Sequence, residues 1–252
     1  MNNVKTYFKV ICLVWLYFTN MVTGHAQFGG TQRAARYEVG FGLGTLVYLG
    51  DLTPKKIGDF SFSKPAFDIS LYRSIREGFF VRLGMQYGRL SGDDSKYTNP
   101  WWEKSRNFKF STDVGELSLT GGWNILGDAN NDYRKLSPFI LAGVGLAYVN
   151  IKRDWSRLDR SWYATDFPVL LQGLMRDSAR SLPQFMPVLP VGAGARYEVS
   201  ERISMSFAAM YRIMFTDYLD GFSYGANPSK KDHYYSLSLA LIYNLSKGSW
   251  YY

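Results

Sequence analysis

The stretch Arg202 to Phe215 reads R-I-S-M-S-F-A-A-M-Y-R-I-M-F, and it decides how the rest of the chain is interpreted. Every second residue from Ile203 onward is apolar, whereas the residues between them are polar, small or flexible. Successive side chains of a strand point to opposite faces, so the alternation predicts a strand with one apolar face. It passes the roughly five or six residues of an ordinary strand and reaches the roughly 9 to 11 that cross a bilayer. We therefore expect Phe207, at mid-span, to face lipid.

The same alternation recurs in seven other parts of the chain. Strands are predicted at residues 36–49, 66–75, 79–89, 108–125, 138–149, 188–198 and 234–245. No apolar run in the sequence reaches the ~18 residues expected of a membrane helix. Pro190 cannot donate to a strand ladder, so we expect it to lie at the rim.

The connections between these strands alternate in length. They are short at 76–78 and 199–201, intermediate at 126–137, and long at 50–64, 90–107, 150–186 and 216–233. An even number of strands with short turns on one side and long loops on the other is typical of an outer-membrane barrel, whose short turns are periplasmic. The predicted fold is therefore all-β, a transmembrane antiparallel up-and-down β-barrel of about eight strands. A barrel of this size is filled by its own side chains, which argues against a porin.

The first 26 residues are typical of a cleaved signal peptide. Lys5 and Lys9 precede an apolar run at 10–18, and small residues lie at the expected cleavage site after Ala26. This predicts export, followed by one barrel domain at 27–252 with a long loop at 150–186. Because the protein is expected to be exported, nucleic acid is an improbable partner. Basic residues in the long loops either face anionic lipid or lipopolysaccharide, or form a solvated surface.

Charged residues at inward positions of the predicted strands are expected to pair inside the barrel. Charges away from bulk water are tolerable when they are paired and hydrogen-bonded. The residues predicted for this interior polar network are Glu38, Asp68, Arg82, Glu116, Arg196, Glu198, Arg202 and Arg212. A proton or ion path is the alternative interpretation of the same residues.

The intermediate connection at 126–137 is long and polar for a periplasmic turn. It is therefore the best candidate for contacts with a periplasmic partner. The predicted contact residues are Asp128, Asn130, Asn131, Asp132 and Arg134. In the longest loop, residues 167–176 have apolar side chains at helical spacing, which predicts a short amphipathic helix that lies on the membrane, caps the barrel, meets a partner or packs within its own loop.

Catalytic and cofactor motifs are sparse. The chain after residue 26 has one histidine, His233, with Ser229 and Ser236 near it in sequence, so a serine–histidine pair is a remote alternative. Neither metal-ligand spacings nor a phosphate-binding glycine loop is present in the sequence. We expect no enzyme activity, no cofactor and no metal.

Four segments carry a family resemblance: 37–52, which closes on Y-L-G-D-L; 106–118; 189–198; and 212–223, which contains T-D-Y-L-D-G. In these the chain resembles the PorG-like family of small outer-membrane barrels from Bacteroidota, linked to type IX secretion and gliding. Residues 175–181, M-R-D-S-A-R-S, depart from the acidic, glycine-rich turn that we would expect of that family. The resemblance implies an outer-membrane anchor for a periplasmic lipoprotein or ring component of a secretion machine.

The sequence thus supports three hypotheses on function. The first is a non-enzymatic outer-membrane barrel that organises periplasmic components through its short turns. The second is a surface-exposed binding or adhesion barrel that acts through its long loops. The third, and most remote, is a lipid-modifying enzyme.

Overall fold

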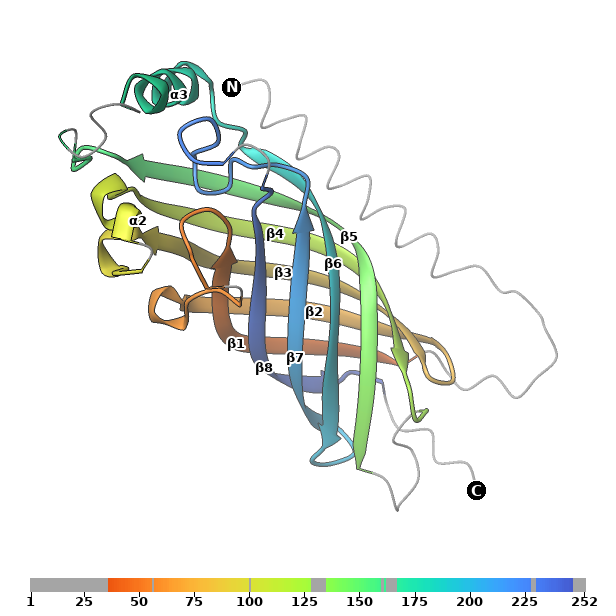
Figure 1. The fold of residues 1–252 in the computed structure, drawn as a ribbon. Coiled ribbons are helices and arrows are strands. Elements are labelled where there is room, and N and C mark those ends of the chain that lie inside the picture. The colour runs from red at the N-terminus through yellow and green to blue at the C-terminus, as the bar shows by residue number, and fades with distance from the viewer. Residues whose placement is uncertain are drawn as a thin grey trace, which may run out of the picture. The chain divides into compact units, whose positions relative to one another are not determined.

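A computed structural model describes residues 36–55, 57–99, 101–127, 135–159, 161, 167–227 and 230–246. In it, eight antiparallel strands form a closed barrel in chain order, and the first strand also pairs with the last (Figure 1). This confirms the predicted fold class. The signal peptide predicted at residues 1–26 lies outside the described residues. None of the described helices has the length and apolarity to cross a membrane.

The eight strands are β1 (Tyr37–Leu49), β2 (Lys64–Arg76), β3 (Phe79–Asp93), β4 (Lys109–Asn124), β5 (Leu136–Asp154), β6 (Phe185–Glu198), β7 (Ile203–Met214) and β8 (His233–Asn244). Four of the strands, β2, β3, β5 and β6, are longer than the sequence pattern suggested. The helices of the connections are η1 (Phe60–Phe62), η2 (Asp94–Lys96), α2 (Trp101–Arg106) and α3 (Phe167–Ala179). The helix predicted within the longest loop is thereby confirmed.

The largest difference from the predicted boundaries is in β5, which continues to Asp154 instead of ending at 149. Its last residues are polar and still pair with β4, up to the partners Asp154 and Lys109. The alternation of apolar side chains ends where one face of the strand is no longer next to apolar groups. The hydrogen-bonded ladder between β4 and β5 continues beyond that point. The sheet therefore extends past its apolar band on this side of the barrel.

The outer wall of the barrel is apolar around its whole circumference. Exposed large apolar side chains occur on every strand, among them Phe41, Phe67, Met85, Leu117, Val144, Phe185, Phe207 and Leu239. The residues between them are buried or partly buried, as period-2 alternation requires. Phe207 is 49% exposed on β7, whereas the adjacent Ser206 is buried. The predicted outward direction of Phe207 is confirmed.

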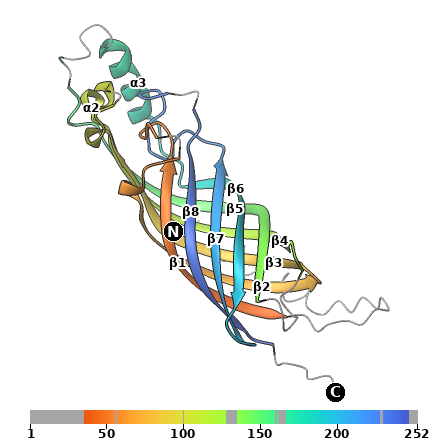
Figure 2. The same ribbon diagram turned by 60° about the horizontal axis from the view of Figure 1, so that its bottom comes forward.

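Two rows of exposed aromatic side chains border this apolar band. One row lies toward the long connections and contains Tyr87, Tyr148, Phe185 and Tyr211; the other lies toward the short turns and contains Phe79, Trp123, Tyr197 and Tyr243. Figures 1 and 2 show α2, α3 and the long connections at one end of the barrel and the short turns at the other. We call these the loop end and the turn end.

Two buried cores fill the barrel and its loop end. Toward the turn end, a smaller core inside the barrel contains Tyr72, Phe80, Phe139, Leu141, Met210 and Ile242. A cavity of about 20 Å³ adjoins it, which is room for about one water molecule. A larger core combines the outer parts of the strands with the long connections and contains Leu52, Phe108, Leu174, Leu219 and Phe222, among others. We call the connections 50–63, 94–108, 155–184 and 215–232 together the loop cap.

Candidate functional site

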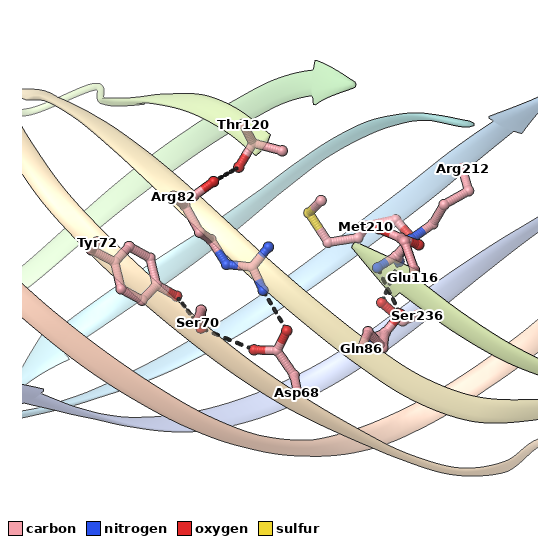
Figure 3. Close-up of polar contacts among 10 residues, drawn as sticks. All are labelled: Asp68, Ser70, Tyr72, Arg82, Gln86, Glu116, Thr120, Met210, Arg212 and Ser236. Atoms are coloured by element: carbon pink, nitrogen blue, oxygen red, sulfur yellow. Dashed lines mark hydrogen bonds and ion pairs between the residues drawn. The ribbon is translucent and has the colours of Figure 1, made fainter. Parts of the chain in front are cut away.

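The first group of interior charges lies in mid-barrel and joins β2 to β3. Arg82 Nη2 donates to Asp68 Oδ2 at 2.5 Å, and both side chains are buried. Ser70 Oγ lies 3.1 Å from the other oxygen of Asp68 and 3.4 Å from the hydroxyl of Tyr72. Figure 3 shows these four side chains pointing toward one another inside the barrel. The charge pair is thus held by neutral hydroxyl groups as well.

A second group lies closer to the loop end and is centred on Arg212 of β7. Its Nε donates to Glu116 of β4 at 3.0 Å, and Tyr234 of β8 donates to the same Glu116 oxygen at 2.8 Å. Its terminal nitrogens donate to Gln86 at 2.8 Å and to Ser236 at 2.5 Å. Four strands therefore meet on one buried guanidinium (Figure 3). Removal of either charge would leave the other buried and unpaired.

The third group lies at the turn end. Glu38 of β1 pairs with Arg196 of β6 at 2.6 Å and with Arg36 at 2.7 Å. Arg36 also lies 3.8 Å from Glu198. The predicted network thus consists of three groups that share no hydrogen bond among those the structure gives. We interpret them as pairs that hold the strands in register, since the adjoining cavity has room for about one water molecule.

Arg202 was expected in this network, and the structure corrects that expectation. It lies before β7 in the turn, with an exposed side chain. The backbone nitrogens of Val199 and Ser200 both donate to the carbonyl of Ile203 at 2.9 Å, which closes the turn tightly around Arg202. The inward alternation therefore begins only at Ser204. The predicted partner contacts at Asp128, Asn130, Asn131, Asp132 and Arg134 lie outside the described residues.

The loop cap contains a buried hydrogen-bond chain that sequence reasoning did not identify. The hydroxyl of Tyr48 lies 2.6 Å from Asp232 Oδ1 and 2.8 Å from Asp220 Oδ2, and all three side chains are buried. A hydroxyl has one proton and can donate it to only one carboxylate, so the other acid must bring a proton of its own. The arrangement therefore requires one protonated carboxyl group between the two aspartates.

The remaining contacts of the two acids identify which one carries that proton. Asp232 Oδ2 accepts from the backbone N–H of Leu219 at 3.0 Å and from that of Asp220 at 3.4 Å, as an ionised carboxylate would. Asp220 accepts one such bond, from the backbone N–H of Phe222 to Oδ1 at 2.8 Å, and its Oδ2 contacts the Tyr48 hydroxyl. Asp232, with two backbone donors, is therefore the acid whose charge is better stabilised. When a single proton remains on the pair it lies on Asp220, which donates to Tyr48, and Tyr48 donates to Asp232.

Burial raises the pKa of several acids in the loop cap, because a carboxylate loses its hydration there. Desolvation places the pKa of Asp232 at about 8 and that of Asp220 well above its usual value, and the charge of Asp232 raises the latter further. Burial also raises the pKa of Asp217 to about 7 and that of Glu103 to about 7. The cap is thus the part of the molecule with groups that titrate near neutral pH.

Asp177 of α3 organises a second part of the loop cap. One of its oxygens accepts from the backbone nitrogens of Ser223 at 3.1 Å and Gly225 at 2.8 Å. The other accepts from the backbone nitrogen of Tyr224 at 3.1 Å and from the hydroxyl of Tyr218 at 3.2 Å. One side chain therefore holds α3 against the connection between β7 and β8.

A buried ion pair fixes the remaining connections. Arg106 of α2 donates from Nε to Asp94 at 2.7 Å and from Nη2 to the other Asp94 oxygen at 3.0 Å, a bidentate geometry. Its Nη2 also donates to the carbonyl of Asp51 at 3.0 Å. Lys230 donates to the carbonyl of Gly50 at 2.8 Å. Through these bonds the described parts of the four connections are linked to one another.

The residues missed by sequence reasoning lie in segments that had already been singled out for another reason. Tyr48 and Asp51 belong to Y-L-G-D-L, and Asp217 and Asp220 belong to T-D-Y-L-D-G, both quoted above for the family resemblance. The available signal was an acid next to a leucine or tyrosine, as in Asp51-Leu52, Asp217-Tyr218 and Leu219-Asp220. These two segments meet in the structure through Tyr48 and Asp220.

A catalytic pair at His233 is not assembled in the described residues. His233 Nδ1 accepts from the backbone nitrogen of Met214 at 3.2 Å, and Ser236 is bound to Arg212 inside the barrel. Ser229 lies outside the described residues. A search of the described part for three or more metal-ligating side chains that could hold an ion found none.

Solved structures with a similar fold are small barrels of outer membranes. Neisserial surface protein A is 14% identical over 84% of this chain and 99% of that chain, with a TM-score of 0.47. The attachment invasion locus protein Ail of Yersinia pestis is 11% identical over 84% of this chain and 100% of that chain, with a TM-score of 0.45. A major outer membrane protein of Thermus thermophilus is 14% identical over 84% and 100%, with a TM-score of 0.42.

No curated protein matches the sequence. A family model does match it, over residues 25–252, and so includes the whole barrel and its loop cap. The chain therefore belongs to the family described as Domain of unknown function (DUF6089).

Proposed function

We propose that this protein is an outer-membrane β-barrel that works without catalysis, by binding through its loop cap at the cell surface. The support for the membrane location is the apolar outer wall, closed around eight strands and bordered by two aromatic rows. A protein in water rarely exposes a continuous apolar surface of that size. Short turns of such barrels are periplasmic and long loops face outward, which assigns the loop cap to the outside.

The observation that carries the binding role is the internal order of the loop cap. Long loops of a barrel that served only as an anchor would need no buried core of their own. Here Asp177, Arg106 and the chain from Asp220 through Tyr48 to Asp232 fix four connections against one another. Fixed loops present a pre-organised surface, and pre-organisation lowers the entropic cost of binding a partner.

A second candidate is the role implied by the PorG-like resemblance, an anchor of periplasmic components of a type IX secretion apparatus. The observation in its favour is that segments 37–52 and 212–223, which carry the resemblance, meet through the buried side chains of Tyr48 and Asp220. Such an anchor would act through the turn end, with residues 126–137 as its contact.

One experiment separates the two candidates. Asp177→Ala removes the acceptor of four hydrogen bonds in the loop cap, while deletion of residues 129–132 alters only the periplasmic turn. Each variant is crosslinked in intact cells, and barrel folding is checked by resistance of the purified protein to sodium dodecyl sulfate without heating. The surface-binding proposal predicts that Asp177→Ala loses its crosslinked partners and the deletion keeps them. The reverse result would instead support the periplasmic anchor.

A further inference from the structure

Charges in the loop cap are sorted between its inside and its surface. The buried acids are Asp51, Asp59, Asp94, Glu103, Asp177, Asp220 and Asp232. Among the described residues of the cap, the exposed bases are Lys55, Lys96, Lys104, Arg157, Arg176, Arg180, Lys230 and Lys231, whereas Asp159 is an exposed acid and Arg106 a buried base. The surface of the cap is therefore more cationic than the formal net charge of +8 for the whole sequence suggests. Such a surface attracts anions over several ångströms.

Two of these bases differ from the others because they lie on aromatic rings. The guanidinium of Arg176 is 5.6 Å from the ring centroid of Tyr224, and that of Arg180 is 4.6 Å from the ring centroid of Tyr218. Arg176 lies in the last turn of α3, and Arg180 directly follows the last helical residue, Ala179. In the described part of the chain, neither has a carboxylate within ion-pair distance.

The rings beneath these arginines are held in place. The hydroxyl of Tyr218 donates to Asp177 at 3.2 Å, and the backbone nitrogen of Tyr224 donates to the same side chain at 3.1 Å. Arg153 adds a bond from Nη2 to the carbonyl of Asp177 at 2.8 Å and one from Nη1 to the carbonyl of Gly221 at 2.5 Å. Both aromatic supports are thus fixed to α3 through one buried carboxylate.

We propose that Arg176, Arg180, Tyr218 and Tyr224 form a binding face for phosphate groups carried on anionic saccharides of the cell surface. Nη1 of Arg180 lies 3.5 Å from the Tyr218 hydroxyl. A guanidinium has five N–H donors, so others remain to match the oxygens of a phosphate. Tyr224 is 47% exposed, so part of the ring remains open beside the arginines for the apolar face of a sugar. The inference rests on the proposed function, since it requires the loop cap to face outward.

A structural role for the two arginines is the competing explanation. A cation in the last turn of a helix stabilises it by interaction with the helix dipole, and Arg176 lies in the last turn of α3. Removal of the charge would remove this stabilisation, whether or not a phosphate is bound. Binding and stability of the cap must therefore be measured on the same variants.

The test uses the purified full barrel in detergent and three probes: phosphorylated core oligosaccharide of lipopolysaccharide, the same oligosaccharide after enzymatic dephosphorylation, and inorganic phosphate. The double variant Arg176→Gln with Arg180→Gln is compared with Lys96→Gln with Lys104→Gln, which removes the same charge from η2 and α2. We expect the arginine variant to bind the phosphorylated oligosaccharide at least ~10-fold more weakly, since each charge-assisted hydrogen bond lost is worth ~1.5–3 kcal/mol. The lysine variant should change affinity less than ~3-fold, by long-range electrostatics alone.

The remaining probe and variant identify the ligand and distinguish a loss of binding from misfolding. Competition by inorganic phosphate at similar concentration would make free phosphate the ligand, whereas saccharide-dependent binding supports a glycan. Arg176→Lys with Arg180→Lys keeps charge and helix contacts but not the bidentate geometry, so intermediate affinity is expected. Equal affinities of the arginine and lysine variants, or no preference for the phosphorylated oligosaccharide, would overturn the proposal. These measurements do not depend on which end of the barrel faces outward in the cell. A negative result would therefore overturn the phosphate-binding face but not the proposed function, which surface labelling tests separately.

Discussion

Tyr48 at the end of β1 and Asp232 before β8 are joined by a hydrogen bond of 2.6 Å between residues 184 positions apart in the chain. The bond closes the barrel at its loop end, where β1 and β8 pair through partners that include Leu49 and His233. Because Asp220 contacts the same hydroxyl, this seam between the first and last strands is also the attachment point of the connection between β7 and β8. The position of the proton in the hydrogen-bond chain of Asp220, Tyr48 and Asp232 therefore determines how the loop cap is held.

The assignment of the proton to Asp220 predicts an asymmetry between two similar variants. In Asp220→Asn, the amide N–H₂ can donate to Tyr48 while the amide oxygen accepts from Phe222, so the cap should stay folded. In Asp232→Asn, the amide oxygen can accept from Leu219 while the N–H₂ donates to Tyr48, but with Asp220 also donating to Tyr48 the hydroxyl proton has no acceptor unless Asp220 ionises in the buried cap. An unsatisfied buried group costs ~1–3 kcal/mol, so this variant should be the less stable. Thermal unfolding followed by near-ultraviolet circular dichroism measures both, and equal losses would contradict the assignment.

The raised pKa values predict that the loop cap weakens as pH rises. The pKa of Asp232 is about 8 when folded, against roughly 3.9 for an unfolded aspartate. Between these values the folded state binds more protons than the unfolded state, so the free energy of unfolding falls with rising pH and levels off above pH ~8. Asp217, with a folded pKa of about 7, acts in the same direction. Melting of the cap should therefore begin at lower temperature at pH 8.5 than at pH 6, and a stability that rises over this range would refute the prediction.

The interior ion pair predicts that substitution of Arg212 lowers the free energy of unfolding strongly and that substitution of Arg202 does not. Arg212→Met leaves Glu116 buried without its charge partner, which costs ~3–5 kcal/mol. Arg202→Met removes the same charge from an exposed turn, where substitutions usually change stability by less than ~0.5 kcal/mol. Urea unfolding of the barrel in lipid vesicles gives both values. Similar values for the two variants would mean that Arg212 is not held as described.

The lipid-facing assignment of β7 predicts that Phe207→Arg destabilises the barrel in vesicles by ~2–4 kcal/mol, the cost of arginine near the bilayer midplane. Val169→Arg is the matched control, because Val169 is also exposed and apolar but lies on α3 in the loop cap. It should fold as well as the parent chain. A tolerated Phe207→Arg would place that face of β7 in water.

The sequence was sufficient for the barrel because its cause is periodic. One side of Ile203–Met214 is apolar and exposed on the outer wall and the other side faces the packed interior, and this difference repeats every two residues. The inward direction of Asp68, Arg82, Glu116 and Arg212 follows from the same period. Arg202 was misplaced because periodicity alone does not indicate where a turn begins.

The loop cap could not be predicted in this way, because its contacts follow no period. Tyr48 meets Asp220 across 172 positions, and Asp177 meets Gly225 across 48. The sequence does not distinguish an acid that is buried and hydrogen-bonded to a hydroxyl or to backbone N–H groups from an acid in solvent. The extension of β5 to Asp154 is another such case, since polar residues in a paired strand resemble a loop.

The central claim, that the loop cap faces the outside of the cell, is tested most directly by labelling single cysteines in intact cells. The chain has one cysteine, Cys12, which is first changed to serine. Met175→Cys places a thiol on α3 at a position that is 64% exposed, and Arg202→Cys places one in the exposed turn at the opposite end. With a membrane-impermeant maleimide, the account predicts labelling of Met175→Cys in intact cells and of Arg202→Cys only after the outer membrane is permeabilised. Labelling of Arg202→Cys in intact cells, with Met175→Cys protected, would contradict it.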